Sequence, residues 1–275
     1  MKDKFHITRW FLLLWMAAWT LSCSMNEEME NEMVEVRFKA ALPEEMKTRG
    51  YGDATQVDVV YVSVLDTACH VIKDKEEFAI IDGSADVTFS LAKGCYHFIF
   101  WAQHSNCSLY NITDLKSISV QTTELATISS FADAENTDAF YAVKKYVNVV
   151  SDVPVHEIKM KRPLCQVNVG TSGHAEDAKF QIKAPTLLSP LTEEVSQMKE
   201  WSYTFDNTNA LPTDTFHVNG FVFNRLALCY VLAPDSLMFT SGKVVIGSYE
   251  KEFNTIRIRL NRKSNIIGPF TGATP

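Results

Sequence analysis

Residues 34–40, VEVRFKA, decide the fold class because apolar and charged side chains alternate along them. A period of two puts one set of side chains on each face of an extended strand. The apolar set is Val34, Val36, Phe38 and Ala40, and the charged set is Glu35, Arg37 and Lys39. The stretch therefore predicts a β-strand with one face on a core and the other in water.

Similar runs, either alternating or rich in β-branched and aromatic residues, recur at 57–65, 86–91, 95–103, 157–162, 164–170, 221–234, 243–249 and 253–262. Helix-length periodicity is nearly absent. The one exception, residues 188–201 (LSPLTEEVSQMKEW), is interpreted as a short helix or a decorated loop. Many short strands predict an all-β protein built from β-sandwiches.

A domain boundary is predicted near Pro163, because comparable numbers of predicted strands lie on either side of it. We expect an N-terminal β-sandwich over residues 34–162 and a C-terminal β-sandwich over residues 163–275. Each is of typical domain size. A single extended sandwich is the alternative.

The first 22 residues have the layout of a secretory signal peptide. Lys2, Lys4 and Arg9 precede an apolar run at 10–21 (WFLLLWMAAWTL), and the small residue Ser22 follows it. The run is too short to span a bilayer, which needs about 20 apolar residues. A buried core helix is disfavoured by the N-terminal position and the preceding cations.

Cys23 follows this segment in the sequence LSC, which resembles a bacterial lipobox, although Thr20 stands where that motif usually has Leu. The resemblance implies cleavage before Cys23 and lipidation of its sulfur; the alternative is ordinary cleavage beside an incidental cysteine. Residues 23–33 then form an acidic tether, with four glutamates and no basic residue. The tether resembles the export tract of surface-exposed lipoproteins of Bacteroidota.

The charge balance weighs against a nucleic-acid partner. The chain carries a net charge of −7, and the predicted signal peptide holds three cations and one anion, so the remainder is near −9. A basic strand face near the C-terminus, formed by Arg257, Arg259, Arg262 and Lys263, is interpreted as solvated. We expect a protein held at the outer membrane by lipid.

No sequence motif for catalysis is present: GxSxG, HExxH, a P-loop and GxGxxG are all missing. The nearest approach to a zinc site is the set Cys95, His97, His104 and Cys107. A core strand running into a polar loop explains this set better. We therefore predict neither an enzyme nor a metal or cofactor site.

Five cysteines remain if Cys23 is lipidated, and none of them forms a CxxC pair. Four lie in predicted strands or at strand ends and are expected to be small buried hydrophobic residues: Cys69, Cys95, Cys165 and Cys229. A disulfide between Cys95 and Cys107 is the alternative.

Several stretches together resemble the fimbrillin-like lipoproteins of Bacteroidales, in particular a subgroup with a domain of unknown function related to minor-fimbria anchor and tip proteins. They are residues 42–66, 138–142, 158–170, 226–235 and 261–270. The resemblance implies two tandem transthyretin-like β-sandwiches. It also implies a fimbrial or pilus component, or an adhesin, whose partners are other fimbrial subunits.

Arg49, in KTRGY, occupies a place comparable to the arginine after which shaft subunits of the resembled family are cut. In those subunits the cut releases the first strand, and a strand from another subunit fills the groove. The alternative is an ordinary loop arginine, because anchor-type members are not processed. Members usually continue beyond the NIIG-like motif, so an end at PFTGATP implies a terminal subunit that accepts a strand without donating one, or a truncated product.

A second function remains open, namely a lipoprotein that binds a carbohydrate or another polymer without assembling into fimbriae. Exposed aromatic side chains would carry such binding, and the candidates are Trp101, Trp201 and Tyr203. All three could equally belong to the core.

Overall fold

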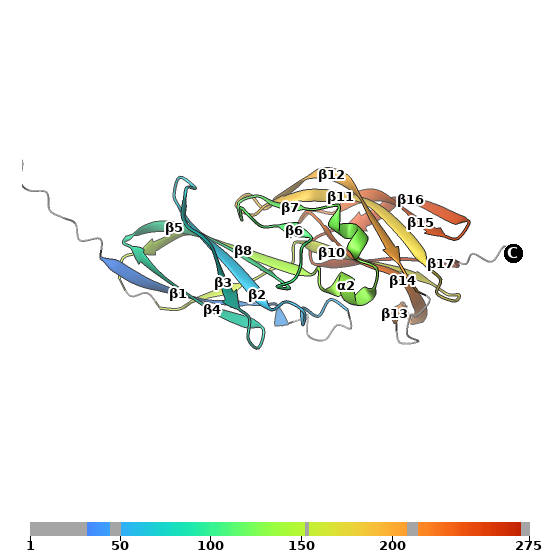
Figure 1. Ribbon diagram of the computed structural model, residues 1–275, viewed down its shortest axis with the longest axis horizontal. Helices are drawn as coiled ribbons and strands as arrows, with labels where there is room; N and C mark the ends of the chain where they lie inside the picture. Colours follow the sequence, from blue (N-terminus) through green and yellow to red (C-terminus); the bar gives the residue numbers. More distant parts are fainter. Residues whose placement is uncertain (1–31, 45–50, 152–153, 208–213, 271–275) are drawn as a thin grey trace, which may run out of the picture.

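The computed structural model describes residues 32–44, 51–151, 154–207 and 214–270 of the chain. Within these residues the protein is almost entirely β-structure, as the sequence predicts (Figure 1). The described helical segments are the short turns η2 (Glu124–Thr127) and α2 (Phe131–Glu135). Neither is long and apolar enough to cross a membrane.

Two facing sheets form the N-terminal end of the molecule (Figure 1). One has the order β4 (Ser84–Ala92), β1 (Met33–Ala41), β9 (His156–Lys159). The other has the order β3 (Val71–Ala79), β2 (Val59–Asp66), β5 (Gly94–Gln103), β8 (Ala139–Val149). The Phe38 ring of β1 meets those of Phe98 and Phe100 on β5, with centroids 4.5 and 5.5 Å apart. The alternation predicted for residues 34–40 is thus confirmed, with its apolar set buried and its charged set exposed.

A second pair of sheets forms the C-terminal end. One has the order β13 (Thr215–Val218), β14 (Phe221–Leu232), β10 (Leu164–Thr171), β17 (Arg262–Gly268). The other has the order β16 (Tyr249–Ile258), β15 (Met238–Ile246), β11 (Ala178–Ser189), β7 (Ile118–Val120), β6 (Tyr110–Asn111), and β12 (Glu194–Phe205) also pairs with β11. A buried cluster joins these sheets, with Val167 on β10 and Phe180 on β11 among its members.

The sheet that contains β5 is covered on both faces. Phe98 and Phe100 face the β4–β1–β9 sheet, whereas Ile99 and Trp101 point the other way and join the core cluster of the C-terminal sheets. The Trp101 ring meets the Tyr110 ring edge-on, with centroids 5.2 Å apart, and the Trp101 Nε1–H donates to Gln103 Oε1 at 2.8 Å. Tyr110 belongs to β6, so the segment after β5 connects the two pairs of sheets.

The division near Pro163 stays a prediction. Strands β6 and β7 precede this residue in the sequence, yet β7 pairs with β11, on the far side of it. The polypeptide therefore contributes to the C-terminal sheets before it has completed the N-terminal ones with β8 and β9.

The interpretation of residues 188–201 as a helix or loop is wrong. They form the end of β11, a turn at Pro190–Glu193, and the first part of β12. Glu194–Glu200 are largely exposed, so they show no alternation that would indicate a strand. Their extended form comes from pairing with β11, for example between Leu188 and Val195.

Replacing Trp101 by alanine tests the double-sided burial of β5. The side chain is completely buried, and its loss leaves a cavity, so we expect the free energy of unfolding to fall by about 3–5 kcal/mol. Phe221→Ala is the matched control, because Phe221 is 70% exposed and should change stability by less than about 0.5 kcal/mol. Urea unfolding measures both. Equal effects of the two substitutions would contradict this packing.

Candidate strand-exchange interface

Strand β1 is held along both edges. It pairs antiparallel with β4 along its whole length, from Met33 opposite Ala92 to Ala41 opposite Ser84. Its second half pairs parallel with β9, beginning with Phe38 opposite His156, and these two rings stack with centroids 5.2 Å apart. Without β1, two strand edges would face each other across a groove with pockets for alternate side chains. Strand addition between proteins uses this geometry.

Arg49 lies outside the described residues, as do Cys23, the predicted signal peptide and nearly all of the predicted acidic tether. The structure describes the chain on both sides of Arg49. Before it, the Leu42 N–H donates to the Gly83 carbonyl at 2.9 Å. After it, the described chain begins again at Tyr51, whose ring meets that of Phe131 on α2 and whose carbonyl accepts from Lys263 on β17.

Gly52 is fixed on both sides of its peptide group. Its N–H donates to Glu135 Oε2 at 2.8 Å, and its carbonyl accepts from the Arg162 guanidinium at 2.8 Å. Its φ is +77°, and a Cβ here would lie 2.6 Å from Gln166 Oε1 and 2.9 Å from the Tyr230 hydroxyl oxygen. Only glycine suits this position. The chain that follows Arg49 is therefore anchored to the C-terminal sheets at Gly52.

The groups that hold Gly52 form a buried ionic cluster, which we call the junction cluster: Glu135, Asp138, Arg162 and Tyr230. Arg162 pairs with Asp138 at 2.5 Å, and their side chains are 1% and 2% exposed. Burial raises the pKa of Asp138 to about 6, although the Arg162 charge lowers it. Burial also raises the pKa of Glu135, against hydrogen bonds from the Tyr230 hydroxyl and Gly52. Sequence reasoning missed this cluster, because Arg162 in KMKRP looks like an ordinary surface cation.

A second open edge lies at the C-terminal end. Among the described strands, β17 pairs only with β10 and β16 pairs only with β15. A groove of about 450 Å³ runs between them, lined by Phe253, Thr255, Ile256, Arg257, Lys263, Ser264, Asn265, Ile266 and Ile267. Two strand edges that are unpaired among the described strands can also receive an extended segment.

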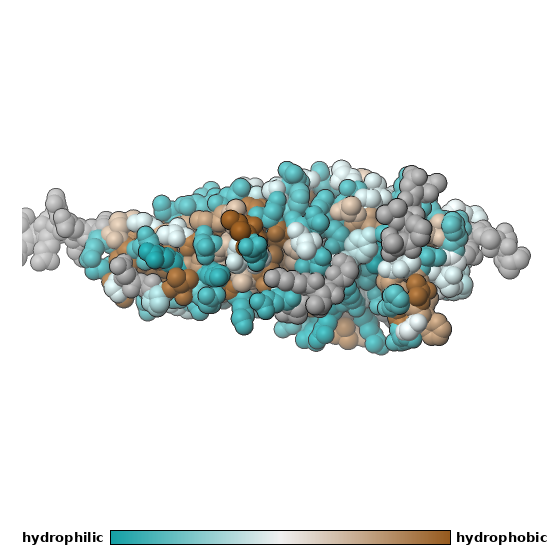
Figure 2. All heavy atoms as spheres, turned by 90° about the horizontal axis from the view of Figure 1, so that it is seen from below, coloured by the Kyte–Doolittle hydropathy of each residue, from teal (hydrophilic) through white to brown (hydrophobic). Residues whose placement is uncertain are grey.

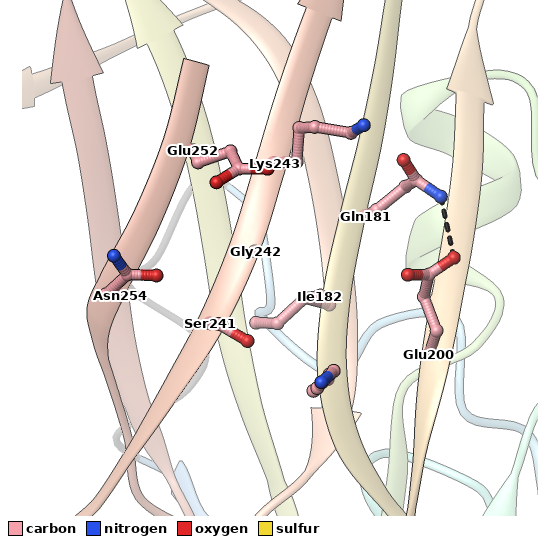
Figure 3. Close-up of a pocket in the computed structure, with 9 residues that line it drawn as sticks. Gln181, Ile182, Glu200, Ser241, Gly242, Lys243, Glu252 and Asn254 are labelled. Carbon is pink, nitrogen blue, oxygen red and sulfur yellow. Dashed lines mark hydrogen bonds between the residues drawn. The ribbon is translucent and has the colours of Figure 1, made fainter. Parts of the chain in front are cut away.

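The depression in Figure 3 is a different kind of feature. It lies on β11, β12, β15 and β16, beside the irregular pairing between Thr240 and Gly242, where a Cβ on Gly242 would be 2.6 Å from the Gln181 carbonyl oxygen. The Gln181 and Glu200 side chains point toward each other and hydrogen-bond at 2.7 Å. Lys243 pairs with Glu250 at 3.2 Å. None of the described residues that line the depression has a buried polar atom without a partner, so we interpret it as a solvated sheet surface.

The zinc and disulfide alternatives both fail on distance. Cys95 is at the start of β5 and Cys107 follows its end, so about 25 Å of extended strand separates them at about 3.3 Å per residue. His97 Nδ1 accepts from the Tyr146 N–H at 3.0 Å instead. All the described cysteines are free, and no group of potential metal ligands occurs in the described part of the chain.

The prediction of buried cysteines is right for two residues and wrong for two. Cys165 and Cys229 are buried in β10 and β14, whereas Cys69 and Cys95 are only half-buried. Cys69 lies in the turn between β2 and β3, where its φ of +65° belongs to a tight connection. Apolar neighbours in the sequence therefore do not ensure that a cysteine at the end of a strand is buried.

The prediction that three exposed aromatic residues could bind a carbohydrate is wrong. Trp101, Trp201 and Tyr203 are at most 1% exposed. Trp201 Nε1–H donates to the Ala184 carbonyl at 3.3 Å inside the C-terminal core. The spacing of Trp201, Tyr203 and Phe205 at every second residue indicates one buried strand face, and that signal could have excluded them.

Comparison with known proteins gives a family and a fold. Residues 25–233 match the model of a family of unknown function, DUF6562. No curated protein matches the chain.

Among solved structures, a proposed adhesin of Bacteroides thetaiotaomicron has a TM-score of 0.53 at 13% identity, covering 81% of this chain and 80% of that one. A proposed polysaccharide-binding protein of the same organism has a TM-score of 0.53 at 14% identity, covering 85% and 90%. The fimbrial anchor protein Mfa2 of Porphyromonas gingivalis has a TM-score of 0.50 at 13% identity, covering 81% and 82%. The predicted likeness to Bacteroidales fimbrial and adhesin proteins is confirmed at the level of the fold.

The junction cluster should make stability depend on pH. A carboxyl group whose pKa is higher in the folded than in the unfolded chain makes its full contribution to stability when the pH is below its unfolded pKa. This contribution is lost as the pH rises through the folded pKa. As the pH rises from about 4 to about 6, we therefore expect the titration of Asp138 to reduce the free energy of unfolding by up to about 3 kcal/mol. Urea unfolding at several pH values measures this.

Asp138→Asn should remove that part of the slope, because asparagine does not titrate. Asp74→Asn is the control, since Asp74 is exposed on β3 and should leave the slope unchanged. An unchanged slope in the Asp138 variant would show that the buried pair does not titrate in this range.

Proposed function

We propose that this chain, which belongs to the family of unknown function DUF6562, is a non-enzymatic subunit of a fimbria or an adhesin-type protein displayed at the cell surface. It works by binding strands of neighbouring subunits. The observation that carries this proposal is the position of β1, between β4 and β9, with every second side chain buried.

The pairing of β1 supports exchange in particular. An incoming strand in its place would gain main-chain hydrogen bonds from both β4 and β9, and these supply affinity without regard to sequence. Selectivity would come from the sites of Val34, Val36, Phe38 and Ala40, all at most 4% exposed. The aromatic site is the most demanding, because Phe38 is surrounded by the rings of Phe98, Phe100 and His156.

The fold likeness gives separate support. Mfa2, a fimbrial anchor protein, and an adhesin-type protein share this arrangement of sheets over about four fifths of the chain. Their identity to this chain is 13%, so they support the architecture of such a subunit and leave its partners open.

A lipid anchor at Cys23 completes the proposal. Each buried CH₂ contributes about 0.8 kcal/mol, so one acyl chain binds a membrane reversibly and two or more hold it firmly. The acidic segment that follows would keep the sheets away from the membrane surface. Attachment at Cys23 would place β1 at the membrane-proximal end of the chain.

Replacing Cys23 by serine should release the protein from the outer membrane, because serine has no thiol to acylate. Fractionation of cells that express the full chain measures this, and Cys69→Ser is the matched control, since Cys69 is a half-buried thiol in a turn. Membrane retention of the Cys23 variant equal to the wild type would contradict lipid anchoring.

Cleavage after Arg49 would separate β1 covalently from the remaining chain while Gly52 stays anchored by the junction cluster. If the subunit is of the processed type, N-terminal sequencing of protein from the outer membrane or from fimbriae should begin at Gly50. Arg49→Ala should abolish that N-terminus and reduce incorporation into high-molecular-weight assemblies. Arg37→Ala, an exposed arginine on β1, is the control. An intact lipidated N-terminus on the wild-type protein would mean an unprocessed anchor type.

A further inference from the structure

The outer face of the β13–β14–β10–β17 sheet carries a polar cavity of about 370 Å³, distinct from the β1 groove. Its lining residues are Tyr51, Gln166, Asn168, Thr215, Phe216, His217, Arg225, Lys263 and Asn265. The floor is buried, since Gln166, Asn168 and Arg225 are at most 3% exposed. The rim is open, since His217, Lys263 and Asn265 are exposed. The cavity is therefore a pocket with a closed bottom, not a flat surface.

Arg225 is the unusual group in this floor. Its guanidinium carbon lies over the rings of Tyr51 and Phe216, at 4.6 and 5.0 Å from their centroids. One terminal nitrogen donates to Asn168 Oδ1, but Nε has no partner. No ion pair joins Arg225 to a carboxylate of the described residues. Asp214 and Glu135 act on this buried charge only from beyond ion-pair distance, so an anion in direct contact with the guanidinium would be favourable.

Two cationic side chains are among the described residues that line the cavity. Arg225 lies at its floor and the Lys263 ammonium at its rim, where Nζ donates to the Tyr51 carbonyl at 3.0 Å. No aspartate or glutamate is among the described residues that line it. The nearest carboxylate in sequence to this wall, Asp214, accepts from the Tyr51 hydroxyl at 2.5 Å. The two cations in the lining favour an anionic ligand.

The remaining polar groups indicate which anion. Gln166 Oε1 is a buried acceptor without a partner, and neither a carboxylate nor a phosphate dianion can donate to it. A hydroxyl group can. Thr215 and the Asn265 amide can donate to and accept from further hydroxyls at the same wall. A ligand that carries a carboxylate and several hydroxyl groups satisfies both kinds of orphan group.

We propose that this cavity binds a sugar acid, such as one hexuronic acid unit of an acidic polysaccharide, with its carboxylate on Arg225 and Lys263. The planar guanidinium matches a carboxylate. The cavity volume is at the small end of the range for ligand pockets, as one sugar unit requires. This binding goes beyond strand exchange and uses none of the β1 groove, so either property can fail without the other.

Titration calorimetry of the full-length chain in detergent, with D-glucuronate as the probe, tests the proposal. We expect glucuronate to bind at least tenfold more tightly than glucose or acetate, with an affinity that falls as salt is added. Glucose binding as tightly would overturn the role of the cations. Acetate or inorganic phosphate binding as tightly would overturn the sugar assignment, and no heat with any probe would overturn the site.

Two substitutions localise the binding. Lys263→Ala lies on the exposed rim and should weaken glucuronate binding severalfold, and Arg225→Lys should abolish it, because lysine keeps the charge but loses the planar fork. Lys243→Ala is the control, since Lys243 lies on the other C-terminal sheet. If Arg225→Lys proves unfolded by circular dichroism, the rim variants Lys263→Ala and Asn265→Ala decide. Unchanged affinity in both rim variants would place any binding elsewhere.

Discussion

The double burial of the β3–β2–β5–β8 sheet is the constraint on which the architecture depends. Most sheets in antiparallel proteins have one face in water, and their strands alternate. In β5 the residues from Tyr96 to Gln103 are all buried, because Phe98 and Phe100 face one core while Ile99 and Trp101 face the other. One strand thereby belongs to both cores. The two pairs of sheets are connected through packed side chains as well as through the chain itself.

This connection brings charged groups inside, which sandwich packing alone does not require. The Arg162–Asp138 pair lies at the junction, and desolvating two such charges costs several kcal/mol each before their attraction is counted. Replacing a buried pair with apolar residues often stabilises a protein, so stability alone does not explain its presence. The pair, together with Glu135, fixes one particular backbone segment, at Gly52. We interpret the cluster as a positioning element. It holds the chain at Gly52 through residues that do not belong to β1.

The parts that the sequence predicted are those where one physical effect dominates. The apolar pattern of residues 34–40 and 95–103 predicts both that they form strands and which of their side chains are buried. Strand β3 and the first half of β12 are exposed and charged, so only their neighbours make them strands. The junction cluster and the Arg225 cavity were not predictable, because each joins residues more than 50 positions apart whose types are ordinary on a surface. Pairwise proximity of this kind has no local signal.

The energetics of β1 limit how an exchange can take place. Its buried apolar side chains include Val34, Val36 and Phe38, and burying each contributes about 1.5–3 kcal/mol. Their sum is comparable with the whole net stability of a typical domain, about 5–15 kcal/mol. Cutting the chain after Arg49 removes none of these contacts, so a cut alone would leave β1 in its groove. Departure of β1 before another strand arrives would expose the N-terminal core and two strand edges at once. If β1 is exchanged as we propose, the exchange would proceed stepwise, with an incoming strand taking over the pairing to β4 and β9 as β1 leaves. The short parallel ladder with β9, which begins only at Phe38, is the weaker of the two and the place where such a takeover would start.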